Sequence, residues 1–67
     1  MTLKEKISTR LKQWRSARGL KQREVAGGVD VSLKTYQKYE EGGLVPPTER
    51  LLKLAEVFEV TVNDLIY

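Results

Sequence analysis

The chain has 67 residues, with twelve Lys and Arg, nine Asp and Glu, and neither His nor Cys. This length predicts one small domain over residues 1–67, too small to enclose a catalytic cleft. Without Cys and His there are no disulfides and no thiolate or imidazole catalysis, and the usual zinc and iron ligand sets are missing. We therefore expect a binding module and not an enzyme, with no catalytic residues, no metal and no cofactor.

The net charge of +3 is unevenly distributed along the chain. Residues 1–39 hold ten basic and three acidic side chains, whereas residues 40–67 hold two basic and six acidic ones. This asymmetry favours a surface that faces a polyanion. The N-terminal residues are too charged for a targeting signal, and no apolar run is long enough to span a bilayer. We expect a cytoplasmic protein without a membrane partner.

Helical periodicity dominates the first part of the chain. Thr2 and Glu5 have the spacing of a capping box, which predicts a helix start, and Gly19 is typical of a helix end. The apolar stripe of this first helix recurs at steps of three and four: Leu3, Ile7, Leu11, Trp14 and Ala17.

The next two helices are short. The second is predicted over residues 22–28, where Gly27 and Gly28 each cost about 1 kcal/mol relative to Ala. The third begins after Ser32, a favourable N-cap, and ends before Gly42. The inward residues of the second helix and its end are Val25, Ala26 and Val29.

Two further helices complete the prediction. Pro46 and Pro47 interrupt the periodicity, and a fourth helix covers residues 48–58. Thr61 and Asp64 have N-cap spacing, which predicts a short fifth helix. The apolar face of the fourth helix is Leu51, Leu54, Ala55 and Phe58. The fold class is therefore all-α, with five helices.

The second and third helices are joined by about three residues, 29–31, which forces them to cross steeply, as in a helix-turn-helix over residues 22–41. Ala26 is small enough for a close helix contact, and Asp30 tolerates the left-handed backbone region that the turn needs. Tyr36, Tyr39 and Glu40 share one face of the third helix and are predicted to face the core. The opposite face shows Leu33, Lys34, Gln37, Lys38 and Glu41.

Several segments together resemble the Cro/phage-repressor type of helix-turn-helix domain, the xenobiotic-response-element family, in its five-helix, lambda-repressor-like form. They are residues 19–26 (GLKQREVA), 31–32 (VS), 39–42 (YEEG), Pro46, 51–55 (LLKLA) and 60–65 (VTVNDL). The resemblance covers roughly residues 7–66. The sequence departs from the family pattern at Lys21, at Gly27 and Gly28, at Asp30, and at residues 43–45.

The resemblance implies that the N-terminal part of the third helix enters the major groove of DNA. Base contacts then fall to Ser32, Leu33, Lys34, Gln37 and Lys38, whose side chains match base edges: Lys suits guanine, Gln suits adenine and Leu suits the thymine methyl. Phosphate contacts are expected from Gln22, Lys21, Arg23 and Arg10, and Gln22 is also expected to brace the third helix.

The resemblance also implies a partly buried ion pair between Arg15 and Glu40, with a direct phosphate contact as the alternative for Arg15. Trp14 is interpreted as a core residue. For Lys12 and Arg18 the choice between phosphate and solvent stays open.

The functional expectation is a sequence-specific regulator of transcription that binds double-stranded DNA, a repressor from a bacterium or phage, associated with the nucleoid. One module reads too few base pairs for selectivity, so we expect a homodimer on a pseudo-palindromic operator, with recognition helices about 34 Å apart. No small-molecule ligand is evident. The alternatives are a protein-interaction module such as an antitoxin, or a weakly specific nucleic-acid-associated factor. Candidate dimer residues are Leu44, Val45, Phe58, Glu59, Val60, Val62, Ile66 and Tyr67.

Overall fold

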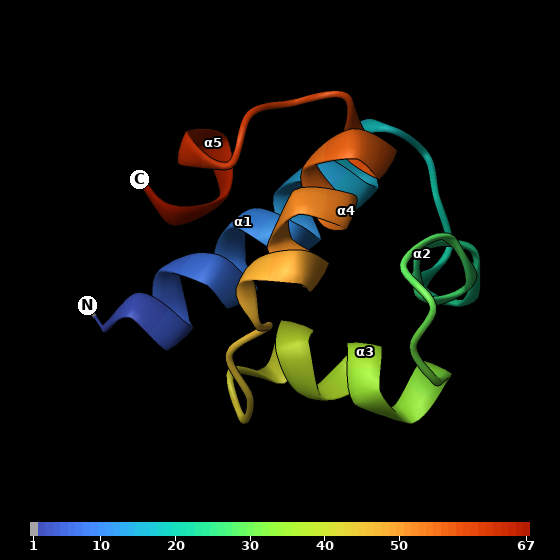
Figure 1. Cartoon of the computed structure of the whole chain (residues 1–67), viewed down its shortest axis with the longest axis horizontal. Helices are drawn as coiled ribbons and strands as arrows, with labels where there is room; N and C mark the ends of the chain where they lie inside the picture. The colour runs from blue at the N-terminus through green and yellow to red at the C-terminus, as the bar shows by residue number, and fades with distance from the viewer. Residues whose placement is uncertain (1) are drawn as a thin grey trace.

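The computed structural model describes residues 2–67, and its elements are five helices, which confirms the all-α prediction (Figure 1). They are α1 (Leu3–Ala17), α2 (Gln22–Gly28), α3 (Leu33–Glu41), α4 (Thr48–Phe58) and α5 (Asn63–Ile66). None of these helices combines the length and the apolar character that a bilayer crossing requires.

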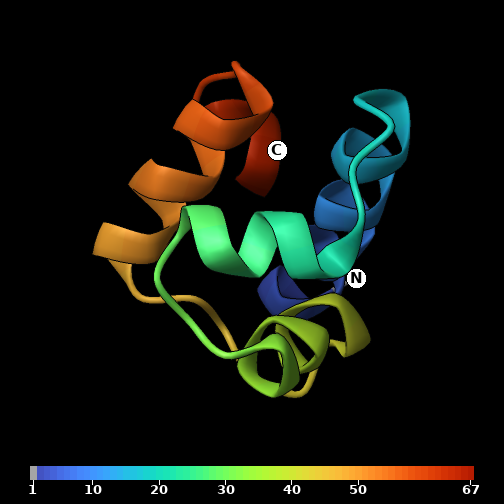
Figure 2. The ribbon, with the colours of Figure 1, turned by 90° about the vertical axis from the view of Figure 1, so that its right-hand side faces the viewer.

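The steep crossing of α2 and α3 is visible in two orthogonal views. Figure 1 shows α2 end-on and α3 from the side, whereas Figure 2 shows α2 from the side and α3 end-on. Ala26 is 2% exposed, and its carbonyl accepts from the backbone N–H of Val31 beyond the turn. Asp30 has a φ of 57°, so the turn uses the left-handed region at the residue predicted for it. The crossing sets the direction in which α3 presents its outer face.

All five helices contribute to one apolar core. Tyr36 and Phe58 are its largest fully buried side chains, and the rings of Tyr36 and Tyr39 meet edge to face with centroids 6.3 Å apart. The core-facing prediction for both tyrosines is therefore confirmed. The buried apolar residues are Ile7, Leu11, Val25, Ala26, Val29, Tyr36, Tyr39, Leu54, Ala55, Phe58 and Leu65.

The apolar stripe predicted for α1 is wrong at its two ends. Leu3 is 53% exposed and Ala17 is also exposed, because the elements packed on α1 cover its central turns only. Trp14 is half-buried against the core, and its indole N–H donates to the carbonyl of Asp64 in α5. Trp14 therefore attaches α5 to α1 in addition to filling space.

Most helix ends follow the sequence signals. Thr2 and Glu5 form the reciprocal capping box, and the Ser32 hydroxyl accepts from the N–H of Thr35. Lys21 has no capping oxygen, and the carboxylate of Glu24 accepts from its backbone N–H instead. The start of α2 thus keeps one half of the usual reciprocal cap.

The two glycines of α2 differ in their surroundings. A Cβ at Gly27 would meet no atom within 4 Å, whereas one at Gly28 would lie 3.0 Å from a methyl group of Val57 in α4. Gly28 therefore marks the place where α2 approaches α4.

This difference makes a testable prediction about stability. Gly27→Ala should raise the free energy of unfolding by about 1 kcal/mol, because Ala loses less backbone entropy in a helix and the site is open. Gly28→Ala is the matched control and should gain less, since Val57 must shift to admit the methyl group. Urea unfolding followed by circular dichroism measures both, and equal gains would contradict the assigned α2–α4 contact.

Candidate nucleic-acid interface

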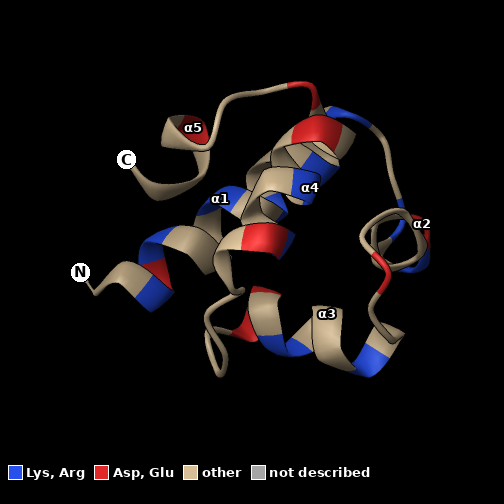
Figure 3. Cartoon of the chain, viewed as in Figure 1, with Lys and Arg blue, Asp and Glu red and all other residues tan. Residues whose placement is uncertain are grey.

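The outer face of α3 carries the side chains that the sequence assigned to base reading. Ser32, Lys34 and Lys38 are exposed, and Leu33 and Gln37 are half-buried. Figure 3 shows basic positions along α3 and acidic positions near its C-terminal end. Within residues 2–67, neither Lys34 nor Lys38 forms a hydrogen bond or an ion pair with another side chain. Both ammonium groups are thus free to meet an external acceptor.

Ser32 caps the N-terminus of α3. Its hydroxyl accepts from the N–H of Thr35 and donates to the hydroxyl of the same residue, at 3.1 and 2.9 Å. The hydroxyl proton is therefore committed to the cap, and a base could use only a remaining lone pair of the oxygen.

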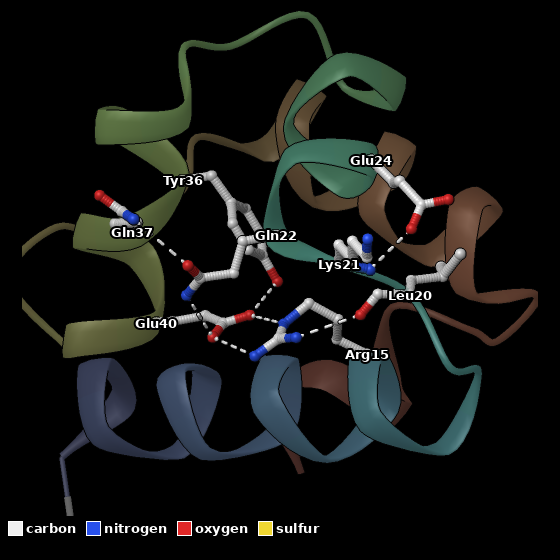
Figure 4. Close-up of polar contacts among 8 residues, drawn as sticks. All are labelled: Arg15, Leu20, Lys21, Gln22, Glu24, Tyr36, Gln37 and Glu40. Carbon is white, nitrogen blue, oxygen red and sulfur yellow. Dashed lines mark hydrogen bonds and ion pairs between the residues drawn. The ribbon is translucent and has the colours of Figure 1, made fainter.

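Glu40 lies behind this face at the centre of a polar cluster (Figure 4). Its carboxylate accepts from Arg15 Nε at 2.6 Å and Nη2 at 3.1 Å, from Gln22 Nε2 at 3.0 Å, and from the hydroxyl of Tyr36. Arg15 Nη1 also donates to the carbonyl of Leu20 at 3.1 Å. The cluster joins α1, α2 and α3, and Glu40 is only 4% exposed.

The cluster holds its members in defined charge states. Burial raises the pKa of Glu40, but hydrogen bonds from Arg15, Tyr36 and Gln22 together bring that pKa below its ordinary value. Burial, followed by the contact with Glu40, raises the pKa of the Tyr36 hydroxyl. The hydrogen bond with Glu40 raises the pKa of Arg15. At neutral pH a carboxylate therefore faces a guanidinium and a neutral phenol, an arrangement that orients the three helices.

The residues predicted to contact phosphate fall into two places. Lys21 and Arg23 are exposed at the start of α2, and Gln22 is half-buried between them, with its amide directed to α3. Arg10 lies elsewhere, because its Nη2 donates to the carbonyl of Tyr67 at 2.5 Å. The prediction that Arg10 shares a side with Lys21 and Arg23 is therefore wrong. Its position on α1 turns it toward the C-terminal residue, which lies far from α2 in Figure 1.

Two polar contacts had no signal in the sequence. Arg18, which the sequence left between phosphate and solvent, donates from Nε to the carbonyl of Phe58 at 2.8 Å. Its guanidinium also lies over the ring of Trp14, one turn earlier in α1. Lys53 of α4 forms an ion pair with Asp30 in the turn, at 2.9 Å. Both link residues far apart in the chain, and both depend on tertiary proximity. Because the Asp30–Lys53 pair is exposed, it adds little stability.

The candidate dimer residues are only partly available at the surface. Phe58 is fully buried and is removed from the list, because its ring fills the core. Leu44 and Tyr67 are 43% and 74% exposed, and Leu52, which was not singled out in the sequence, is 51% exposed. The half-buried members are Val45, Val60, Val62 and Ile66, and Glu59 is exposed.

The described residues contain no group of acidic side chains arranged to hold a metal ion.

Comparisons with known proteins agree on one family. A helix-turn-helix family model matches residues 11–65. The chain is 37% identical over 60 residues to the transcriptional repressor RstR of the cryptic phage CTXphi in Vibrio cholerae, covering 90% of this chain and 54% of RstR. It is 34% identical over 61 residues to the HTH-type transcriptional regulator DdrOP3 of Deinococcus deserti, covering 91% of this chain and 47% of the regulator.

A solved structure supports the same assignment. The crystal structure of the clp gene regulator ClgR from Corynebacterium glutamicum matches with a TM-score of 0.92 and 25% identity, covering 97% of this chain and 69% of ClgR. The chain spans about half the length of the curated relatives it matches. The relatives are named as a transcriptional repressor, an HTH-type transcriptional regulator and a clp gene regulator. The chain belongs to the helix-turn-helix family, in its Cro/phage-repressor or xenobiotic-response-element branch.

Proposed function

We propose that this protein is a sequence-specific regulator of transcription that binds double-stranded DNA and acts as a repressor. The N-terminal part of α3 lies in the major groove, where Leu33, Lys34, Gln37 and Lys38 meet base edges and Ser32 offers a lone pair. Lys21, Gln22 and Arg23, at the start of α2, contact the adjacent phosphates. Such a protein works in the cytoplasm, on the bacterial nucleoid.

The observation that carries this proposal is the outer face of α3. Lys34 and Lys38 are exposed there without a partner side chain in residues 2–67, on a helix whose opposite face is anchored by buried Tyr36, Tyr39 and Glu40. A rigid helix that presents free donors suits the acceptors at guanine O6 and N7. An apolar face in the same place would favour a protein partner.

A homodimer completes the proposal. A single recognition helix reads only a few base pairs, and two copies on a pseudo-palindromic operator supply the missing selectivity. The exposed Leu44, Leu52 and Tyr67, which belong to the loop before α4, to α4 itself and to the end of the chain, are candidates for the dimer contact. RstR is named as a transcriptional repressor. In our proposal this chain also represses, because the bound dimer occupies a site that the transcription machinery needs.

Selection of binding sites from a random duplex pool tests the function. We expect a half-site repeated with two-fold symmetry, its two copies centred about one DNA turn apart. Analytical ultracentrifugation with the selected duplex should give two protein chains per duplex, and one chain at saturation would contradict the dimer. If no sequence is enriched although duplex DNA is bound, the protein is a weakly specific nucleic-acid factor. If duplex DNA is not bound, a protein-interaction role such as that of an antitoxin takes its place.

A further inference from the structure

Two charged faces of the domain are not used by the proposed contact with DNA. One lies on α1, where Leu3, Lys6 and Arg10 follow each other at steps of three and four and therefore share one side of the helix. Tyr67 adjoins this side, because Arg10 donates to its carbonyl and because Lys6, Arg10 and Tyr67 line the same surface pocket. We call these four residues the basic face.

The second face lies on α4. Leu52 has Glu49 three residues before it and Glu56 four residues after it, so the three side chains lie together on one side of the helix. All three are exposed, since the opposite side of α4 is the one buried in the core. Figure 3 shows basic positions in the first half of α1 and acidic positions at both ends of α4. We call Glu49, Leu52 and Glu56 the acidic face.

Both faces expose large apolar side chains. Leu3 and Tyr67 on the basic face are 53% and 74% exposed, and Leu52 on the acidic face is 51% exposed. These are three of the four large apolar side chains exposed in residues 2–67, and the fourth is Leu44. A single exposed leucine is ordinary. Here the exposed apolar groups instead gather beside charges of one sign, which is typical of a surface that meets a partner of the other sign.

Charges on the two faces are left unpaired within the part of the chain that the structure describes. The two ion pairs found there involve other residues, so Lys6, Glu49 and Glu56 have no partner of opposite charge. One face therefore offers positive charge beside apolar groups, and the other offers negative charge beside a leucine. Each copy of the chain carries both halves of a complementary contact.

Because the proposed function needs two copies of this chain, we propose that the basic face of each copy contacts the acidic face of the other. A two-fold axis brings unlike faces together twice, so the dimer contains the same contact on both sides of the axis. Leu52 then packs against Leu3 and Tyr67 of the second copy, and the two cations of the basic face lie opposite the two carboxylates of the acidic face. Leu44 takes no part in this contact.

Charge reversal in the absence of DNA tests the contact. Sedimentation equilibrium gives the dissociation constant of the dimer for the wild-type protein, for Lys6→Glu, for Glu56→Lys and for an equimolar mixture of the two variants. Each variant alone sets like charges against each other at both contacts, and its dimer should be about 10-fold weaker than the wild-type dimer. In the mixture, one chain of each variant restores opposite charges at both contacts, so the wild-type affinity should return. A mixture that dimerises no more tightly than its components overturns the proposal.

Lys12→Glu is the control with the same charge change. Lys12 is exposed on α1 six residues after Lys6, a spacing that places it on another side of the helix. This control should leave the dissociation constant unchanged. If it weakens the dimer as much as Lys6→Glu does, net charge governs the association and the assigned faces are wrong. Circular dichroism checks that each variant is folded.

A second pair of variants tests the apolar part of the contact. Leu52→Gln should weaken the dimer by about 10-fold, because the substitution removes a packed side chain at both contacts. Leu44→Gln is the matched control, since Leu44 is also exposed but lies outside both faces. Equal weakening by the two variants, or weakening by Leu44→Gln alone, overturns the proposal.

Failure of this contact can be told apart from failure of the proposed function. Wild-type protein that stays monomeric up to about 1 mM without DNA overturns the contact, even where two chains bind one selected duplex. If no duplex is bound, DNA binding fails as the function, and recovery of the dimer in the mixture still supports the contact between the faces.

Discussion

Glu40→Ala is expected to lower the free energy of unfolding by about 3–5 kcal/mol, which leaves the domain largely unfolded at 25 °C. The substitution removes the acceptor for Arg15, Gln22 and Tyr36 together, and Glu40 is only 4% exposed. The half-buried guanidinium and the buried phenol would then lack their partner. A domain of this size has about 3–5 kcal/mol of stability to lose.

Urea unfolding followed by far-ultraviolet circular dichroism measures the effect. Glu41→Ala is the matched control, because Glu41 is the next residue on the same helix and is exposed. That control should change stability by less than about 0.5 kcal/mol. Adding Arg15→Met to Glu40→Ala should recover part of the loss, since it removes the unpaired charge. A Glu40→Ala protein as stable as the Glu41→Ala control would contradict the central role of the carboxylate.

The affinity for a selected duplex is expected to fall about 10²-fold between 50 and 200 mM salt. In the proposed complex the charged side chains that contact phosphates are Lys21 and Arg23, so two subunits neutralise about four phosphates. Each neutralised phosphate releases counterions, which gives a slope of about −3.6 in a plot of log K against log salt concentration. A single subunit would give about half of that slope.

Fluorescence anisotropy at several salt concentrations measures the slope. Arg23→Ala should reduce its magnitude by about two for the dimer and weaken binding to all sequences alike. Arg18→Ala is the control with the same charge change, because the Arg18 guanidinium is directed to the carbonyl of Phe58 and the ring of Trp14. If both variants change the slope equally, the charges act through the overall field and not through the start of α2.

Local sequence signals predicted the helices well because each depends on neighbouring residues. The Thr2–Glu5 cap, the Ser32 cap and the left-handed Asp30 all appear where the sequence placed them. The pairing of Arg15 with Glu40 came from the resemblance and not from any local pattern, and the structure contains that ion pair. The sequence did not predict how much of α1 is buried. Leu3 and Ala17 fit the apolar period of α1 but are exposed, because the period carries no information about how far the helices packed on α1 extend.

The contacts of individual charged side chains were also not predicted from the sequence. Arg10 was expected to contact phosphate, and Arg18 was left between phosphate and solvent. In the structure Arg10 donates to the carbonyl of Tyr67 and Arg18 donates to the carbonyl of Phe58. Phe58 was considered for a dimer surface and lies wholly inside. Orientation about a helix axis is set by all of the packed neighbours together, and a single apolar stripe does not define it.

By itself, the sequence predicted five helices in an all-α fold and located the excess of positive charge in the first three of them, and its resemblance to a known family indicated the helix-turn-helix. The helices and the charge distribution follow from composition, periodicity and fixed spacings, which are local. Only the tertiary structure decided which side chains meet. It showed Glu40 joining three helices, the amide of Gln22 turned toward Gln37, and Arg10 turned toward the C-terminal residue. Contacts between residues distant in the chain arise when the helices pack, because burial then forces every polar group to find a partner.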